Sequence, residues 1–417
     1  MQLSSRIRKA LLLTLLTASA ARAGNLVLES WRVDDKLLWE TVLIPAFQKK
    51  YPGVNVRFAA TTPIDYDASL AERLATGSAG DLLACRPFDA SLSLYRKGYL
   101  DKLDGKSGMQ HFAPAALLAW QTDDGKDTFC MPVASVIHGF LYNKRIFRKL
   151  NLQAPVTEAQ FFALLDAVKA NGAYAPLALG TAERWEASQT VFTNIGPNYW
   201  RGEEGRRALV AGKAKFTDPQ YLAAFAFEER LAPYLSKGAD SQTYAQSQVQ
   251  FALGKAAIYP AGSWDLAYFN QSAGLDLGVF APPVRRAGDR CRISDHMDIG
   301  FGVNRNSRNK EDAYKLIEWL GSQEFADLHT NRLTGFFSLS NHLIAVRDPL
   351  AKQMASWRNS CATSFRVNAQ FLNRGQPNME HELWAVNAQV LNGTLSARDA
   401  AARVQKGWTQ WYRPPQR

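Results

Sequence analysis

The sequence predicts an α/β protein in which strands alternate with helices and which divides into two domains. The alternation is the first observation, because short apolar runs are separated by segments with helical spacing. Length is the second, since 417 residues are too many for one small core. Composition is the third: 47% hydrophobic and 21% charged residues are ordinary for a globular chain and exclude a disordered or low-complexity protein.

Three strands and three helices alternate in the first hundred residues. The predicted strands cover 25–30, 54–58 and 81–85, and the predicted helices cover 37–50, 67–76 and 92–97. Leu38, Val42 and Leu43 recur at helical spacing in the first helix, while Gly77 and Gly98 end the other two. Such an alternation implies a parallel sheet with helices on both faces.

The remainder of the chain repeats the alternation and ends in helices. Further strands are predicted over 140–142, 176–179, 275–280 and 299–303, and further helices over 144–150, 157–171, 218–231 and 310–320. Thr157 and Gln160 fit a capping box, and Asn309 is the candidate cap of the helix that follows it. The chain beyond residue 360 is predicted to be mostly helical.

Residues 1–23 have the three parts of a secretory signal peptide. Residues 6–9 form a basic start, residues 10–18 a short apolar core, and residues 21–23 a small-x-small cleavage site. This apolar core falls short of the roughly twenty residues that span a bilayer, which disfavours the alternative of a membrane anchor. No cysteine lies at the cleavage site, so a lipid anchor is not indicated. We expect the mature chain to begin at Gly24 and to be exported to the periplasm as a soluble protein.

The net charge is positive without forming a basic patch in the sequence. Lysine and arginine number 49 against 38 aspartate and glutamate residues, but part of the excess lies in the signal segment and the rest is scattered. Nucleic-acid binding usually requires a clustered basic surface. We therefore expect no nucleic-acid partner.

Four cysteines are present, at Cys85, Cys130, Cys291 and Cys361. Their spacings match no zinc motif. An even number in an oxidising compartment favours disulfides, and three connectivities are open. We favour Cys85 with Cys130 and Cys291 with Cys361. Free buried thiols are the alternative, because a core of this size needs no covalent support.

The motifs of common catalytic and nucleotide-binding sites are missing from the sequence. It contains no Gly-x-Ser-x-Gly elbow, no phosphate-binding Gly-x-x-x-x-Gly-Lys loop and no His-Glu-x-x-His pair. Residues 295–298 place two acids around a histidine, which could hold a metal but equally suits the polar wall of a cleft. A pair of carboxylates for glycoside hydrolysis stays open, because their separation is spatial.

Seven segments, in order along the chain, resemble the family 1 extracellular solute-binding proteins, the carbohydrate-binding receptors of bacterial ABC importers. The most specific is Phe251 to Trp264, which is similar to the family pattern F-x-x-G-k-A-A-M-x-x-x-G-x-W, with Ile258 in place of the usual methionine. The others are 44–56, 80–83, 132 with 141–147, 155–161, 306–313 and 391–396. Each segment alone is weak evidence for the resemblance. Seven segments in order behind a signal peptide are strong evidence for it.

This resemblance implies the type II periplasmic binding protein fold, with two lobes joined by a hinge and the ligand in the cleft between them. It places lobe 1 at 24–134 plus 284–335 and lobe 2 at 135–283 plus 336–417. The implied function is capture of a small-molecule carbohydrate and its delivery to the membrane subunits of an ABC permease. We expect a monomer without catalytic residues, cofactor or metal.

A sugar offers hydroxyl groups around its ring and apolar C–H faces, so its site needs aromatic faces and bidentate polar side chains. The loops after predicted strands supply both types, as does the Gly-x-Trp end of the specific segment. The candidate ligand-binding residues are Trp31, Arg32, Asp65, Tyr66, Arg86, Asp89, Trp185, Glu186, Ser263, Trp264, Asp298 and Arg332.

Two other functions remain open from the sequence. A receptor for a non-sugar solute is one, with a phosphorylated polyol favoured by the arginines near the predicted cleft and a polyamine as a further option. A secreted carbohydrate-active enzyme is the other, since aromatic residues and carboxylates also line enzyme clefts.

Overall fold

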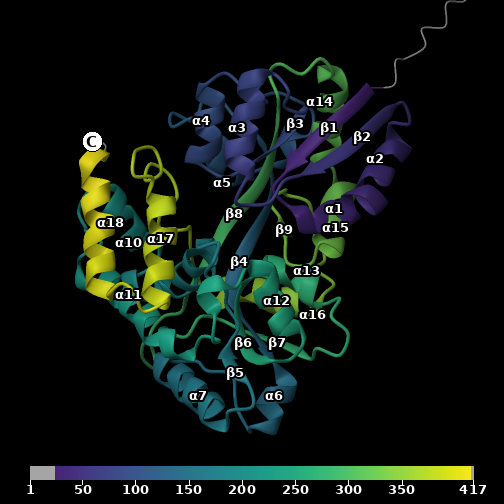
Figure 1. The fold of residues 1–417 in the computed structure, drawn as a ribbon. Helices are drawn as coiled ribbons and strands as arrows, with labels where there is room; N and C mark the ends of the chain where they lie inside the picture. The colour runs from purple at the N-terminus through teal and green to yellow at the C-terminus, as the bar shows by residue number, and fades with distance from the viewer. Residues whose placement is uncertain (1–23, 415–417) are drawn as a thin grey trace, which may run out of the picture.

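A computed structural model describes residues 24–414 of the protein. The predicted signal peptide, residues 1–23, lies outside the described residues. Two lobes are visible, with two long strands running from one to the other and the last two helices packed alongside (Figure 1). Within residues 24–414, no helix combines the length and the apolar character that crossing a membrane requires.

Ten strands and eighteen α-helices make up the fold of the described residues. The strands are β1 (Gly24–Ser30), β2 (Val54–Ala60), β3 (Leu82–Cys85), β4 (Met131–Asn143), β5 (Ala175–Leu177), β6 (Ala256–Gly262), β7 (Leu277–Phe280), β8 (Arg292–Val303), β9 (Phe337–Ser338) and β10 (Ala362–Ser364). The helices are α1 (Lys36–Leu38), α2 (Ile44–Lys50), α3 (Tyr66–Thr76), α4 (Asp89–Arg96), α5 (Pro114–Leu117), α6 (Lys144–Lys149), α7 (Glu158–Asn171), α8 (Thr193–Ile195), α9 (Pro197–Trp200), α10 (Glu203–Val210), α11 (Pro219–Leu231), α12 (Tyr244–Ala252), α13 (Leu266–Phe269), α14 (Lys310–Leu320), α15 (Gln323–Arg332), α16 (Pro349–Ser360), α17 (Met379–Leu391) and α18 (Ala397–Trp411).

Lobe 1 contains the sheet predicted from the first hundred residues. β1 pairs in parallel with both β2 and β3, which confirms that part of the prediction. The predicted helix over 37–50 forms as α1 and α2 joined by a π-helical turn at Trp39–Leu43. Gly77 ends α3 with a φ of 72°, a left-handed conformation that suits glycine.

The sheet is mixed rather than parallel throughout. β8 runs antiparallel to β3, with Cys85 opposite Gly300, and β4 runs antiparallel to β8. The strand order along the main path is β2-β1-β3-β8-β4-β6-β5. The prediction of a parallel sheet is wrong for β8, because this strand returns to lobe 1 from the opposite lobe.

β4 and β8 are the two strands that cross between the lobes (Figure 1). The buried side chains from Met131 to Val136 belong to the core of lobe 1, and Ile137, Phe140 and Leu141 belong to the cores of lobe 2. The predicted strands at 140–142 and 299–303 cover only part of β4 and β8, respectively. Nearly every residue of β4 is buried, so its sequence lacks the alternation that marks a half-exposed strand.

Two predicted caps have different outcomes. Thr157 and Gln160 form the predicted capping box at the start of α7. Asn309 precedes α14 but its side chain makes no capping hydrogen bond, and its Nδ2 instead donates to Asp81 Oδ1 at 3.1 Å. The Asn309 side chain is therefore bound to Asp81 of lobe 1, which also accepts a hydrogen bond from Ser307.

The C-terminal region is less helical than predicted. α17 and α18 confirm the expectation for residues 379–411, and residues 365–378 form an irregular segment between β10 and α17. Val367 and Leu372 pack in the core of lobe 2, while Ala369 packs in the core of lobe 1. This segment therefore lies against both lobes.

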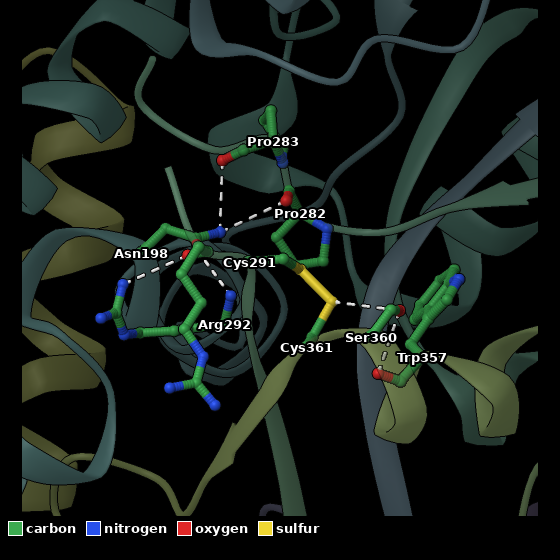
Figure 2. The surroundings of a disulfide bond; sticks show 9 residues. Asn198, Pro282, Pro283, Cys291, Arg292, Trp357, Ser360 and Cys361 are labelled. Carbon is green, nitrogen blue, oxygen red and sulfur yellow. Dashed lines mark hydrogen bonds between the residues drawn. A yellow bond between two sulfur atoms is a disulfide. The ribbon is translucent and has the colours of Figure 1, made fainter. Parts of the chain in front are cut away.

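Both favoured disulfides are present. Cys85 at the end of β3 is bonded to Cys130, which directly precedes β4, and Cys291 is bonded to Cys361. Figure 2 shows the second bond beside Asn198, whose Oδ1 accepts from the backbone N–H of Arg292 at 2.8 Å. The Cys85–Cys130 bond thus ties the start of β4 to β3. The Cys291–Cys361 bond ties the start of β8 to the end of α16.

Candidate functional site

Two cavities lie side by side where the lobes face each other. The larger has a volume of about 270 Å³ and the smaller about 80 Å³. They share a wall of five residues, which we call the shared wall: Trp31, Arg86, Asp298, Arg366 and Glu380. Lobe 1 and the C-terminal region both contribute to this wall, so it forms only when the two are packed together.

Five aromatic side chains contribute to the lining of the smaller cavity. Trp31 follows β1, and Trp264 follows β6. The remaining aromatic residues of the lining are Trp185, Tyr244 and Trp384. The Trp185 and Tyr244 ring centroids lie 4.8 Å apart at an interplanar angle of 61°. Flat apolar faces of this kind suit the C–H face of a ring-shaped ligand.

The Gly-x-Trp end of the specific segment has a steric reason. Gly262 lies against the Trp264 ring, and a Cβ at Gly262 would come within 1.9 Å of a ring atom. Any larger residue would push the indole out of place. Trp264 belongs to the hydrophobic core of lobe 1 although it follows β6 of lobe 2, so this ring reaches across between the lobes.

The larger cavity combines apolar lining residues, such as Leu70 and Phe88, with hydrogen-bonding side chains. Its charged lining residues outside the shared wall are Asp67 and Asp89, and its other polar lining includes Ser91, Asn368, Asn373, Asn378 and His381. Amide, hydroxyl and carboxylate groups together offer both donors and acceptors. The larger cavity can therefore satisfy a ligand that carries several hydroxyl groups.

The guanidinium of Arg86 stacks on the aromatic wall. Its Cζ lies 4.6 Å from the Trp31 ring centroid, Nε donates to Asp67 Oδ1 at 2.9 Å, and Nη2 donates to the Pro63 carbonyl. Burial disfavours this charge, but Asp67 and Glu380 outweigh burial and raise the pKa of Arg86. Arg86 is consequently a fixed cation whose charge is already balanced.

Arg366 is the central group of the shared wall. Its Nε donates to His296 Nε2 at 2.9 Å, Nη2 lies 3.5 Å from Asp298 Oδ1, and Nη1 lies 3.8 Å from Glu380 Oε1. Burial lowers the pKa of Arg366 against the opposing effect of the two carboxylates. A guanidinium stays protonated in proteins, so the contacts are charge-assisted.

Eight of the twelve candidate residues line one or both cavities. They are Trp31, Arg32, Tyr66, Arg86, Asp89, Trp185, Trp264 and Asp298. Arg86 and Asp298 are engaged within the protein as described above, and Tyr66 donates to the Ala84 carbonyl at 2.8 Å. Two further candidates are also engaged. Arg32 donates to Asp35 at 2.8 Å, and Asp89 accepts from the backbone of Phe371 and from Arg374 Nε at 2.7 Å.

The other four candidates line neither cavity. Asp65 is exposed before α3 and accepts from Thr62, and Arg332 is exposed at the end of α15. Glu186 is buried and accepts from Ser247 at 3.1 Å, and burial raises its pKa well above its usual range. Ser263 is also buried and accepts from the backbone N–H of Ile137 at 3.0 Å.

Several lining residues were not predicted from the sequence. Arg366 lies in the irregular segment, Glu380 and Trp384 lie on α17, and Gln189 and Tyr244 lie in lobe 2. Spacing offered one usable signal, because Glu380 and Trp384 are four residues apart and share a helix face. Nothing in the sequence indicates that this face turns toward lobe 1.

A family model for bacterial extracellular solute-binding proteins matches residues 34–326. Among curated proteins, a "Multiple sugar-binding protein" of Streptococcus mutans is 23% identical over 289 residues, covering 67% of this chain and 66% of that protein. An uncharacterised ABC transporter extracellular-binding protein of Pyrococcus horikoshii is 27% identical over 250 residues, covering 59% and 57%. The matches thus span slightly less than two thirds of these relatives' own lengths.

Among solved structures, a "Chitin oligosaccharide binding protein" matches with a TM-score of 0.80 and 20% identity, covering 93% of this chain and 98% of that one. At this identity the similarity establishes the fold, which is the predicted two-lobe α/β fold of solute-binding proteins. The extent of the family match and the fold lead to one conclusion: this chain belongs to the family of bacterial extracellular solute-binding proteins.

Proposed function

We propose that the protein is a receptor that captures a neutral carbohydrate between its lobes and delivers it, chemically unaltered, to the membrane subunits of an ABC permease. The observation that carries this proposal is the pairing of an indole-lined cavity with a polar cavity across the shared wall. Sugars need both kinds of surface at once. The names of the relatives that bind sugars support the same ligand class.

Charge pairing within the cleft favours a neutral ligand over the two charged alternatives. The arginines of the lining are each held by carboxylates: Arg32 by Asp35, Arg86 by Asp67, and Arg366 by Asp298 and Glu380. A phosphorylated polyol would have to displace those carboxylates, and a polyamine would have to displace the arginines. Breaking a buried pair such as Arg32–Asp35 costs several kcal/mol, whereas the Arg86–Asp67 pair costs less because the Asp67 side chain is half exposed.

The same pairing argues against a carbohydrate-active enzyme. A retaining or inverting glycosidase needs one protonated carboxyl group and one free carboxylate beside the scissile bond. Asp67, Asp89, Asp298 and Glu380 all face the larger cavity and all contact an arginine. Such carboxylates can accept hydroxyl protons in hydrogen bonds, which suits a receptor that binds and releases.

The remaining parts of the proposal follow from the family. The mature receptor is a periplasmic monomer that works without a cofactor, and its lobes are 24–134 plus 284–335 and 135–283 plus 336–417. The change of hydrophobic core between Val136 and Ile137 on β4 supports the first of these boundaries.

Thermal-shift measurements on the mature protein test the proposal. A panel of monosaccharides, oligosaccharides and polyols is compared with spermidine and with a sugar phosphate. We expect a neutral carbohydrate to raise the melting temperature in a concentration-dependent manner. Stabilisation by spermidine or the sugar phosphate, with none by any neutral carbohydrate, would overturn the proposal.

A matched pair of tryptophan variants locates the binding. Trp185→Ala removes part of the aromatic wall, and Trp411→Ala removes a partly buried indole on α18 that donates to Pro377. Trp185→Ala should abolish or reduce the thermal shift, whereas Trp411→Ala should keep it.

A further inference from the structure

Two buried histidines touch each other where the crossing strands pass between the lobes. His138 is on β4 and His296 is on β8, and their Nε2 atoms lie 2.9 Å apart. His296 lies opposite Val136, and His138 lies opposite Gly262 of β6. The histidine pair therefore joins the two strands at the position where their side chains change from one core to the other.

The hydrogen bonds of His296 fix which nitrogen of its ring carries the proton. His296 Nδ1 lies 2.9 Å from the Met297 carbonyl, so it donates and His296 Nε2 is left with a lone pair. That lone pair accepts from Arg366 Nε, which always carries a proton. His138 Nε2 lies 2.9 Å from the same atom and packs against the side of this contact. The His296 ring is neutral in this arrangement.

The charged groups around the pair favour the neutral state. Arg366 contacts His296 from the irregular segment, with Asp298 of β8 and Glu380 of α17 on its far side and Arg86 of lobe 1 nearby. Burial, followed by Arg366, lowers the pKa of both histidines well below 6.5. Asp295, the acid next to His296 in the sequence, is engaged by Arg358 of α16.

The histidine pair contacts the shared wall and one tryptophan of the smaller cavity. Through Arg366 it reaches the shared wall, because Asp298 and Glu380 hold the other side of the same guanidinium. The edge of the His138 ring packs on Trp264, with centroids 5.2 Å apart at an angle of 84°. Loss of the pair would free the rotation of Arg366 and remove a support of the indole.

We propose that His138 and His296 are positioning residues for ligand binding, holding Arg366 and Trp264 in place from the crossing strands. This inference rests on the proposed receptor function. His138 lines neither cavity, and His296 lines the larger one. The effect of His138 on affinity is exerted through the Trp264 ring, and that of His296 mainly through Arg366.

Nitrogen-15 NMR of the ligand-free mature protein tests the geometry without any ligand. Long-range proton–nitrogen spectra at about pH 6 should show two neutral rings, with the proton of His296 on Nδ1. A protonated imidazolium at either position, or a proton on Nε2 of His296, would overturn the proposal.

Calorimetric titration with the panel carbohydrate that gives the largest thermal shift tests the positioning. His296→Leu should weaken binding at least about 10-fold, since a hydrogen bond to a charged group is lost. His296→Gln, whose amide oxygen can still accept from Arg366, should recover much of the affinity. His342→Gln is the control: His342 hydrogen-bonds Gly321 outside the cavities and should leave affinity unchanged.

A double-mutant cycle separates positioning from a merely structural role. If His296 acts through Arg366, His296→Leu should change affinity little when Arg366→Met is already present. Additive losses, or a lower melting temperature with unchanged affinity, would overturn the inference and leave the receptor function intact. A wild-type protein that binds no carbohydrate would instead overturn the proposed function, and the positioning role with it.

Discussion

The two cavities of the cleft differ in the side chains that each adds to the shared wall. The smaller adds four aromatic rings, and the larger adds two carboxylates, three asparagine amides and two serine hydroxyls. Apolar contact with a ring is tolerant of orientation, whereas hydrogen bonds to hydroxyl groups depend on donor and acceptor positions. The difference teaches that affinity and selectivity can reside in separate compartments, joined by the five residues of the shared wall.

Replacing Arg366 should have the largest effect, because this residue belongs to both compartments. Arg366→Met removes the guanidinium from the partly buried carboxylates of Asp298 and Glu380 and from the buried His296 acceptor, which costs about 3 kcal/mol. We expect carbohydrate affinity to fall about 100-fold in calorimetric titration. Arg358→Met is the matched control, since Arg358 pairs with Asp295 outside both cavities. Equal affinities for the two variants would show that the compartments are not coupled through Arg366.

Removing an indole should have the next largest effect, on the smaller cavity for Trp264 and on both cavities for Trp31. Trp31→Ala and Trp264→Ala each delete a flat apolar face, and we expect affinity to fall about 10-fold for each. Both rings also belong to the lobe 1 core, so the melting temperature should fall as well. Unchanged affinity in both variants, measured by titration on folded protein, would remove the aromatic wall from the binding site.

Protonation behind the aromatic wall should give a smaller effect, on stability. Asp265 accepts from Tyr244 at 2.5 Å and from Gln248, and burial raises its pKa from 3.8 to about 7. Between these two values the folded protein keeps a proton that the unfolded chain has released, so raising the pH disfavours folding. The free energy of unfolding, measured relative to Asp265→Asn, should fall by at most about 1.4 kcal/mol per pH unit over this range.

Urea unfolding of both proteins at several pH values provides that comparison. Taking the difference between the wild type and Asp265→Asn removes the contribution of the buried histidines, which acts in the opposite direction. A difference that stays constant with pH would mean that Asp265 is ionised in the folded protein.

A change at the rim of the larger cavity should have the smallest effect. Asp67 pairs with Arg86 at 2.9 Å, but its side chain is 54% exposed, so water and salt screen the pair. Asp67→Asn should change carbohydrate affinity less than about 3-fold, corresponding to under about 1 kcal/mol. A loss comparable to that of Arg366→Met would place selectivity at the rim rather than at the shared wall.

Local patterns were sufficient to predict most elements of the fold. Apolar spacing identified the lobe 1 helices at 37–50 and 310–320 but not α5 or α15, and Thr157 with Gln160 marked the start of α7 correctly. The crossing strands were the main omission, because β4 is buried on all sides and gives no period of two. The expectation of a mostly helical chain beyond residue 360 did not locate the irregular segment at 365–378.

The candidate site likewise contains residues that could be predicted from the sequence and residues that could not. Trp31 and Arg86 follow strands directly, where parallel strands of one sheet end together, so their position could be predicted from the element order. Glu186 and Ser263 also follow such positions but turn inward to protein partners. Arg366 carries no local signal, since it lies in irregular chain far from every predicted strand end.

The sequence by itself determined the alternation of strands and helices, the family resemblance and the presence of indoles near a predicted cleft, because these depend on short-range spacing and on residue type. Only the tertiary structure decided that two cavities share one wall and that His138 and His296 meet. These contacts join residues more than a hundred positions apart, and their formation depends on how the crossing strands and the C-terminal segment pack.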